Sequence, residues 1–369
     1  MKDKESILKP WFSIAAGLAV DDEIPSLDVS EDQLCLSCKT SPCCTTVALK
    51  DFEPDSLEEL EQVRYWLGFE RLVIGIWRQG RWSLLYREAC HHLDQETLLC
   101  NVHGSAMQPL VCRQYNSRSC TYRGGMAGRT TGSDLILLDM KRFKEVLKLV
   151  KVSERGLIAS FPTFDEIRAA VIPINDSEIQ SPKPAPRSTR SIEYQGPIRA
   201  DRIGGLDPKN APQLKAWESP CVTCRAPCCE NVFISYDKPR TAAETDFINY
   251  LLGFKGLLLG IEESSEWSIV IQTQCMNFDA VNHKCNVFGT DERPELCNQL
   301  DAWNCNVVRL MDPDRPSPLL LLDHGGYTTI RHLMPFDDEG TVTAWPTRQE
   351  ALTTIVERLK ARTVVRKGE

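Results

Sequence analysis

The sequence has few histidines, no excess of positive charge and no long apolar run. It contains 6 histidines in 369 residues and has a formal net charge of −8. This charge disfavours nucleic-acid binding, which depends on a basic surface. No apolar segment approaches the roughly 20 residues that cross a bilayer, so we expect no membrane association. The G-x-G-x-x-G pattern of dinucleotide-binding folds and the Gly-Lys-Ser/Thr ending of a phosphate-binding loop are also missing.

One short apolar stretch near the start, Trp11–Val20, follows several lysines. This order resembles the core of a signal peptide, but Asp3 and Glu5 interrupt its basic region. We therefore favour an amphipathic helix here and expect the protein to be cytoplasmic. In that compartment cysteines stay reduced by default.

What the sequence does have is cysteine, with 16 residues. An even number permits a disulfide framework. Two adjacent pairs, Cys43-Cys44 and Cys228-Cys229, fit that framework poorly, because neighbouring side chains in an extended chain point to opposite sides. Reduced thiols at these spacings are better interpreted as metal ligands. The predicted ligands are Cys35, Cys38, Cys43, Cys44, Cys90, Cys100, Cys112, Cys120, Cys221, Cys224, Cys228, Cys229, Cys275, Cys285, Cys297 and Cys305.

The cysteines form two sets of eight in the same order. The first two members of each set lie 186 residues apart (35 to 221), and the other six pairs lie 185 apart (43 to 228). Such a register indicates a duplication. We predict an α+β fold of two tandem homologous small domains, each with a helix and a β-hairpin framing a cysteine-rich metal site. The predicted domains are residues 1–172 and 216–369, joined by a Pro/Ser-rich linker at 173–215.

Helices and strands are predicted at matching places in the two halves. Ser56 and Glu59 have the spacing of a helix-capping box, as do Thr241 and Glu244. Gly75 and Gly260 indicate a close approach of the backbone to a neighbour. Trp82 and Trp267 are predicted core aromatics. The predicted helices are 55–69, 241–254, 142–152 and 349–362, and the predicted strands are 72–77, 82–86, 257–261, 267–271, 135–138 and 319–322.

Thiolates suit zinc or iron–sulfur clusters. A single zinc ion takes four ligands, so eight cysteines per half permit two ions, one polynuclear cluster, or four ligands with additional thiols. His103 aligns with Phe288, which argues against a shared histidine ligand, although His91 or His92 could serve in the first half. The positive charges of Arg113 and Arg293 could offset the thiolates, or form ordinary surface ion pairs.

The cysteine pattern resembles the YkgJ-type cysteine-cluster family of zinc- or iron-chelating domains. The resemblance rests on Cys-x2-Cys followed by Cys-Cys, and on a later Arg-Pro-x-x-Cys-Arg pattern. That pattern is represented by Arg293-Pro-Glu-Leu-Cys297-Asn in the second half and by Gln108-Pro-Leu-Val-Cys112-Arg in the first, so each copy keeps one of the two arginines.

The resemblance implies a zinc or iron centre, including an iron–sulfur cluster, and leaves catalysis open. Flagellin lysine-N-methylases are similar around the cysteines, so one alternative is an iron–sulfur enzyme acting in electron transfer or protein side-chain modification. Another is a metal-stapled protein-interaction module. A protein partner or substrate is expected in either case. The oligomeric state and the equivalence of the two copies are not specified by the sequence.

Overall fold

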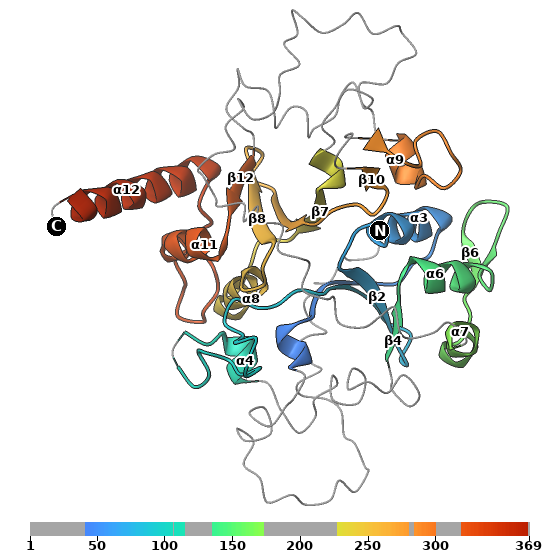
Figure 1. Cartoon of the computed structure of the whole chain (residues 1–369). Helices are drawn as coiled ribbons and strands as arrows, with labels where there is room; N and C mark the ends of the chain where they lie inside the picture. The colour runs from blue at the N-terminus through green and yellow to red at the C-terminus, as the bar shows by residue number, and fades with distance from the viewer. Residues whose placement is uncertain are drawn as a thin grey trace, which may run out of the picture. The chain divides into compact units, whose positions relative to one another are not determined.

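The structure, a computed structural model, describes residues 41–105, 107–114, 135–172, 227–279, 284–299 and 319–367. The predicted linker and Trp11–Val20 lie outside these ranges. The described residues form a mixed α/β protein with antiparallel sheets (Figure 1). None of the helices in these ranges combines the length and the apolar character required to cross a bilayer.

The chain divides into two compact units that do not follow the sequence halves. Unit 1 contains Met1–Asp55 and Val73–Asn175 together with the short segment Gly253–Lys255. Unit 2 contains Asp176–Leu252 and Gly256–Glu369 together with Ser56–Leu72. Each unit therefore includes a segment that the other half of the sequence supplies.

Unit 1 is built on a four-stranded sheet in the order β1-β3-β2-β4. The strands are β1 (Val47–Phe52), β2 (Leu72–Trp77), β3 (Trp82–Tyr86) and β4 (Leu135–Leu138). Every residue of β2 and β3 is buried, which accounts for their nearly continuous apolar sequences. Trp82 is 3% exposed and packs edge-to-face on Phe143 and Phe161, so the predicted core role of this side chain is confirmed.

The remaining elements of unit 1 are short. They are η1 (Pro42–Cys44), α4 (Leu110–Arg113), α6 (Met140–Leu147), β5 (Lys151–Val152), β6 (Ile158–Ser160) and α7 (Phe164–Val171). Asp139 caps α6 by accepting a hydrogen bond from the Arg142 N–H at 2.8 Å. Thr163 and Glu166 form a complete capping box at the start of α7.

Unit 2 has a second four-stranded sheet, in the order β7-β9-β8-β12, and all its pairings are antiparallel. The strands are β7 (Asn231–Tyr236), β8 (Leu257–Glu262), β9 (Trp267–Gln272) and β12 (Leu319–Leu322). This order matches that of the first sheet strand for strand. Trp267, like Trp82, is 3% exposed.

Side-chain hydrogen bonds join the helices of unit 2. Its other elements are α3 (Leu57–Trp66), η5 (Pro227–Cys229), α8 (Ala242–Leu252), β10 (Phe278–Asp279), β11 (Lys284–Cys285), α9 (Glu295–Gln299), α11 (His324–Ile330), η7 (Arg331–Leu333) and α12 (Arg348–Lys367). The buried Tyr327 hydroxyl donates to the Thr245 carbonyl of α8 at 2.9 Å. Arg358 of α12 donates to the Thr329 hydroxyl of α11 at 2.8 Å.

Two matching glycines lie where the sheets leave no room for a side chain. A β-carbon at Gly75 would lie 2.9 Å from Leu85 Cδ1, and one at Gly260 would lie 2.6 Å from Ser268 Oγ. Both distances are shorter than an ordinary van der Waals contact. The predicted close approach at these positions is therefore confirmed.

Most predicted elements are present with small changes of boundary. The helices predicted at 55–69, 241–254 and 349–362 correspond to α3, α8 and α12, and the predicted strands correspond to β2, β3, β4, β8, β9 and β12. The helix predicted at 142–152 is wrong at both ends. It starts at Met140, because Asp139 provides the cap, and it ends at Leu147, because Lys151 and Val152 pair with the strand β6.

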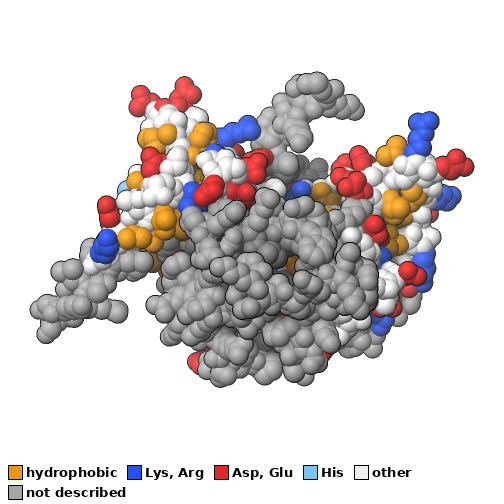
Figure 2. Space-filling view, turned by 90° about the horizontal axis from the view of Figure 1, so that it is seen from above, with side chains coloured by type: hydrophobic (Ala, Val, Ile, Leu, Met, Phe, Trp, Pro, Cys, Tyr) orange, Lys and Arg blue, Asp and Glu red, His pale blue; other side chains and the backbone are white. Residues whose placement is uncertain are grey.

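The surface carries both signs of charge. Figure 2 shows acidic and basic side chains interspersed on the described part of one face. The whole chain has 51 acidic and 43 basic residues. The described part of this face therefore shows no patch of a single charge sign.

Candidate metal centre

The adjacent cysteine pairs lie in tight turns rather than in extended chain. Cys43 and Cys44 are in the 3-10 turn η1, and Cys228 and Cys229 are in the equivalent turn η5. In each pair the second thiol donates a hydrogen bond to the first sulfur. The premise of an extended chain at these pairs is therefore wrong, and the alternation of side chains that an extended chain would impose does not apply.

In unit 1 the cysteine turn is joined to the end of the hairpin. The Cys90 N–H donates to the Cys44 carbonyl at 2.8 Å. Cys100 forms an isolated bridge with Leu93, and Cys112 lies in α4. The hydrogen bond to Cys43, burial, and the negative charges of Cys43, Cys90 and Cys112 raise the pKa of Cys44. These thiols are therefore close enough to influence one another's ionisation.

Unit 2 repeats this arrangement with the second set of cysteines. The Cys275 N–H donates to the Cys229 carbonyl at 2.7 Å, and Cys285 pairs with Phe278. Burial, together with the charges of Cys275, Cys228 and Cys285, raises the pKa of Cys297 to about 12, although Arg293 opposes the shift. None of the ten cysteines that the structure describes is in a disulfide.

Backbone N–H groups point at the sulfur atoms. Cys90 accepts hydrogen bonds from the N–H groups of His92 and Leu93, and Cys275 accepts one from Asn277. These bonds lower the pKa of each thiol, whereas burial, the larger effect, raises it. Donors directed at sulfur stabilise the thiolate, which is the form that binds metal.

The loops after these cysteines have the same hydrogen bonds in both units. The Cys112 N–H donates to the Pro109 carbonyl at 3.0 Å, and the Cys297 N–H donates to the Pro294 carbonyl at 2.9 Å. Gly104 and Gly289 both have positive φ angles, of 72° and 75°. Such angles favour glycine, which explains why each loop has one at this place.

The two sites differ at the position of Gln108 and Arg293. Gln108 of unit 1 is 7% exposed and accepts the Gly104 N–H at 2.8 Å. Its counterpart in unit 2 is Arg293, whose guanidinium lies 4.5 Å from the ring centroid of Phe288. A hydrogen bond from Cys229, and to a lesser extent the charge of Arg293, lower the pKa of Cys228 to about 7, against the opposing effect of burial. Unit 2 thus has a cation that unit 1 replaces with a neutral amide.

The other predicted charged residues differ in placement. Arg113 is exposed at the end of α4, and His91 is also exposed. The His91 N–H donates to the Gly253 carbonyl at 2.7 Å, so the backbone of His91 helps to hold Gly253–Lys255 in unit 1. Of the two arginines expected near thiolates, the structure brings Arg293 into electrostatic reach of Cys228 and Cys297.

Six predicted ligands lie outside the described residues, namely Cys35, Cys38, Cys120, Cys221, Cys224 and Cys305. Within the described ranges, no three side chains of His, Cys, Asp or Glu come together closely enough to hold a metal ion. The thiols there act on one another through charge and through the turn hydrogen bonds. The described part of each site is thus a loose group of thiols.

A segment that the sequence analysis did not place at the sites completes each of them. Phe69 forms an isolated bridge with Cys275 in unit 2, and Phe254 forms one with Cys90 in unit 1. Tyr65 of α3 packs on Phe69 with the ring centroids 5.1 Å apart, and burial, followed by the negative charge of Cys297 and three further thiols, raises its pKa. The two segments share the triplet Leu-Gly-Phe, at 67–69 and 252–254, which indicates a repeat but does not indicate where they pack.

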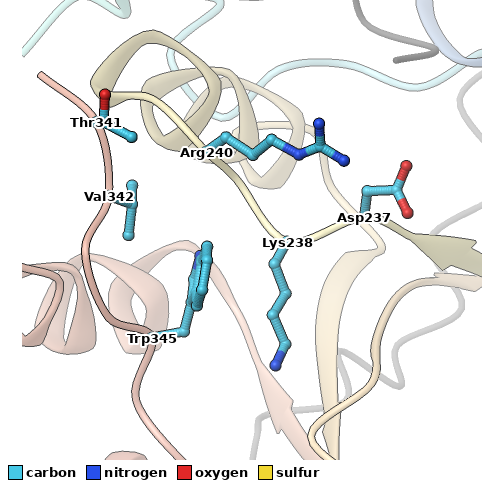
Figure 3. Close-up of a pocket in the computed structure, with 6 residues that line it drawn as sticks. All are labelled: Asp237, Lys238, Arg240, Thr341, Val342 and Trp345. Carbon is cyan, nitrogen blue, oxygen red and sulfur yellow. The ribbon is translucent and has the colours of Figure 1, made fainter. Parts of the chain in front are cut away.

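A pocket lies elsewhere in unit 2. It has a volume of about 460 Å³ and is lined by Asp237, Lys238, Arg240, Thr341, Val342 and Trp345 (Figure 3). The Lys238 amine lies 5.7 Å from the Trp345 ring centroid, and the Trp345 indole donates to the Pro239 carbonyl at 2.7 Å. This open hollow has both signs of charge and none of the cysteines.

Comparisons with known proteins assign no function to this chain, so a functional assignment depends on the site described above. No protein-family model, curated protein or solved structure matches this chain.

Proposed function

We propose that this protein binds metal at two cysteine-rich sites, one in each unit, and that the metal is zinc or iron, an iron–sulfur cluster included. We also propose that the two units are copies of one α+β module. In each module a helix and a hairpin frame the cysteines.

The donor chemistry supports a thiophilic metal. Cysteine thiolates select zinc and iron over hard cations such as magnesium or calcium. Five described thiols in each unit act on one another's pKa or share the hydrogen-bonded turns. Each unit would draw its ligands from them and from the cysteines outside the described ranges. A bound zinc would cross-link the loops, and an iron–sulfur cluster would in addition carry electrons.

The observation that carries the proposal is the set of N–H groups directed at sulfur, repeated in both units. Hydrogen bonds to ligand sulfur atoms tune and stabilise metal–thiolate centres. A buried thiol with no metal to bind has no need of them, because it is neutral and behaves as a small apolar group. The donor at the matching position, His92 for Cys90 and Asn277 for Cys275, thus favours a shared role for the two sulfurs.

The test is metal analysis of protein purified without oxygen. We expect stoichiometric zinc or iron by elemental analysis, and visible absorbance bleached by dithionite if the iron is in a cluster. A chain that retains neither metal at a stoichiometric level would refute the proposal.

Two matched variants assign the metal to its sites. Cys112→Ser removes a thiol from unit 1, and Cys297→Ser removes its counterpart from unit 2. Each should lower the metal content by about half, and the double variant should bind almost none, because a four-ligand site tolerates loss of a thiolate poorly. Full metal content in the folded double variant would show that these two thiols are not ligands.

A further inference from the structure

The cysteine site of unit 2 includes a helix from the first half of the sequence. Helix α3 belongs to unit 2, as do all the described cysteines of the second set. It packs against α9, the short helix that carries Cys297. The site therefore has a wall that residues 216–369 alone do not supply.

Two polar contacts fasten α3 to the segment around Cys297. The Arg64 guanidinium donates to the Asp291 carbonyl at 3.0 Å. The Glu61 carboxylate accepts the backbone N–H of Glu295 at 3.2 Å. One contact lies before α9 and the other at its first residue, so together they hold the loop on the approach to Cys297.

The end of α3 is fastened in a second place, at Cys275. The Met276 N–H donates to the Gly68 carbonyl at 2.8 Å, and the Glu70 N–H donates to the Gln274 carbonyl at 2.9 Å. These bonds flank Cys275 on both sides. Phe69, which lies between them, is 3% exposed.

Tyr65 lies on α3 between these two attachments. Its ring packs edge-to-face on Phe69, with the centroids 5.1 Å apart. Among the charges that act on Tyr65 are those of Cys297, Cys228, Cys229 and Cys275. Because Phe69 pairs with Cys275, these two aromatic side chains lie next to the segment that carries this thiol, where they can limit the access of water and small reagents.

We infer that the unit 2 site is a composite, in which Ser56–Leu72 of the first half forms a cover over the cysteines of the second half. The cover keeps the thiols from reagents and slows the loss of bound metal. The effect on metal rests on the proposed metal-binding function, whereas the shielding of the thiols does not. Unit 1 has a smaller counterpart, because Gly253–Lys255 pairs with the chain on both sides of Cys90.

The test loosens α3 from α9 without removing a cysteine. The double variant Glu61→Ala with Arg64→Ala loses both polar contacts, keeps the net charge and retains good helix formers. The matched control is Glu58→Ala, at an exposed position of the same helix.

The first measurement needs no metal. In the metal-free full-length chain, we expect maleimide to label Cys275 and Cys297 about fivefold faster in the double variant than in the control, because local opening governs access to covered groups. Cys90 and Cys112 should be labelled equally in both. Equal labelling of Cys275 and Cys297 in the two proteins would overturn the inference.

The second measurement follows metal in chains that also carry Cys112→Ser, so that the unit 2 site is the one observed. Release to a chelator should be about fivefold faster in the double variant than in the control, for the same reason. Equal release would overturn the link between the cover and metal retention. Absence of metal from the wild-type chain would instead overturn the proposed function, and the labelling result would still decide whether the cover exists.

Discussion

The replacement of Gly260 by alanine tests how tightly the sheet of unit 2 is packed. A β-carbon at this position would lie 2.6 Å from Ser268 Oγ, 2.9 Å from Leu319 Cδ1 and 3.3 Å from Val270 Cγ2. These atoms belong to β9 and β12, the strands on either side of β8. An added methyl group thus meets both neighbours at once.

Two opposing effects set the magnitude. Alanine restricts the unfolded chain more than glycine does, which stabilises the fold by about 0.4–1 kcal/mol. Overpacking a tight core costs about 1–3 kcal/mol. We therefore expect Gly260→Ala to lower the free energy of unfolding by about 1–2 kcal/mol. Gly75→Ala, which meets Leu85 and Leu135 at 2.9 and 3.0 Å, should behave alike.

Chemical denaturation followed by circular dichroism measures this change. Gly325→Ala is the matched control, because a β-carbon there lies 3.6 Å from Asp323 Oδ1 and the position is helical. It should leave stability unchanged or raise it by up to about 1 kcal/mol. Adding Ser268→Ala to Gly260→Ala should recover part of the loss, since it removes the nearest atom. A Gly260→Ala protein as stable as the wild type would refute the packing argument.

Four further outcomes are expected. Arg293→Gln should move the pH midpoint of iodoacetamide labelling of Cys228 in metal-free protein above about 7, because a positive charge that helps to lower the pKa of Cys228 is lost; an unchanged midpoint would contradict this contact. Thr163→Ala should lower the free energy of unfolding by about 1 kcal/mol in urea titrations, through loss of the α7 cap. The backbone and side-chain donors of Thr163 lower the pKa of Glu166. The Glu166 carboxylate therefore stabilises the fold above the ordinary glutamate pKa, and this stabilisation is lost as the pH falls. The difference in free energy of unfolding between wild type and Glu166→Gln should shrink in acid. Anaerobic treatment with a chelator should lower the Tm, because metal binding contributes to folding free energy, and an unchanged Tm in protein shown to have lost its metal would argue against that coupling.

The local structure of this protein can largely be predicted from its sequence. The spacing of Ser56 and Glu59 placed the start of α3 within two residues, and Ser56 Oγ does accept the Glu59 N–H. The β-rich runs gave β2 and β3 with their observed limits. Such features depend on residues close together in the chain, and the periodicity of the side chains encodes them directly.

Some signals were present but were not used. Asn231–Tyr236 is rich in the β-branched and aromatic residues that are typical of strands. The spacing of Thr163 and Glu166 predicts the start of α7 by the same capping-box rule that predicted α3. These elements could have been predicted.

The exchange of segments between the two halves could not be predicted from the sequence. Both halves carry Leu-Gly-Phe after a helix and a cysteine after a hairpin. Each Leu-Gly-Phe segment could pair with either of the two cysteine segments that follow a hairpin. The sequence does not indicate which pairs form, because the local chemistry of both pairings is the same. The structure pairs Phe69 with Cys275 and Phe254 with Cys90.

This pairing has a consequence for the order of biosynthesis. The ribosome makes Ser56–Leu72 before any cysteine of the second set, so the cover of unit 2 is waiting when Cys275 and Cys297 emerge. Unit 1 is in the opposite position, because Cys43, Cys44 and Cys90 are made long before Gly253–Lys255. Since a nascent chain folds as it emerges, the thiols of unit 1 stay open to oxidants and to metal donors until Gly253–Lys255 is made, whereas Cys275 and Cys297 emerge with their cover already present.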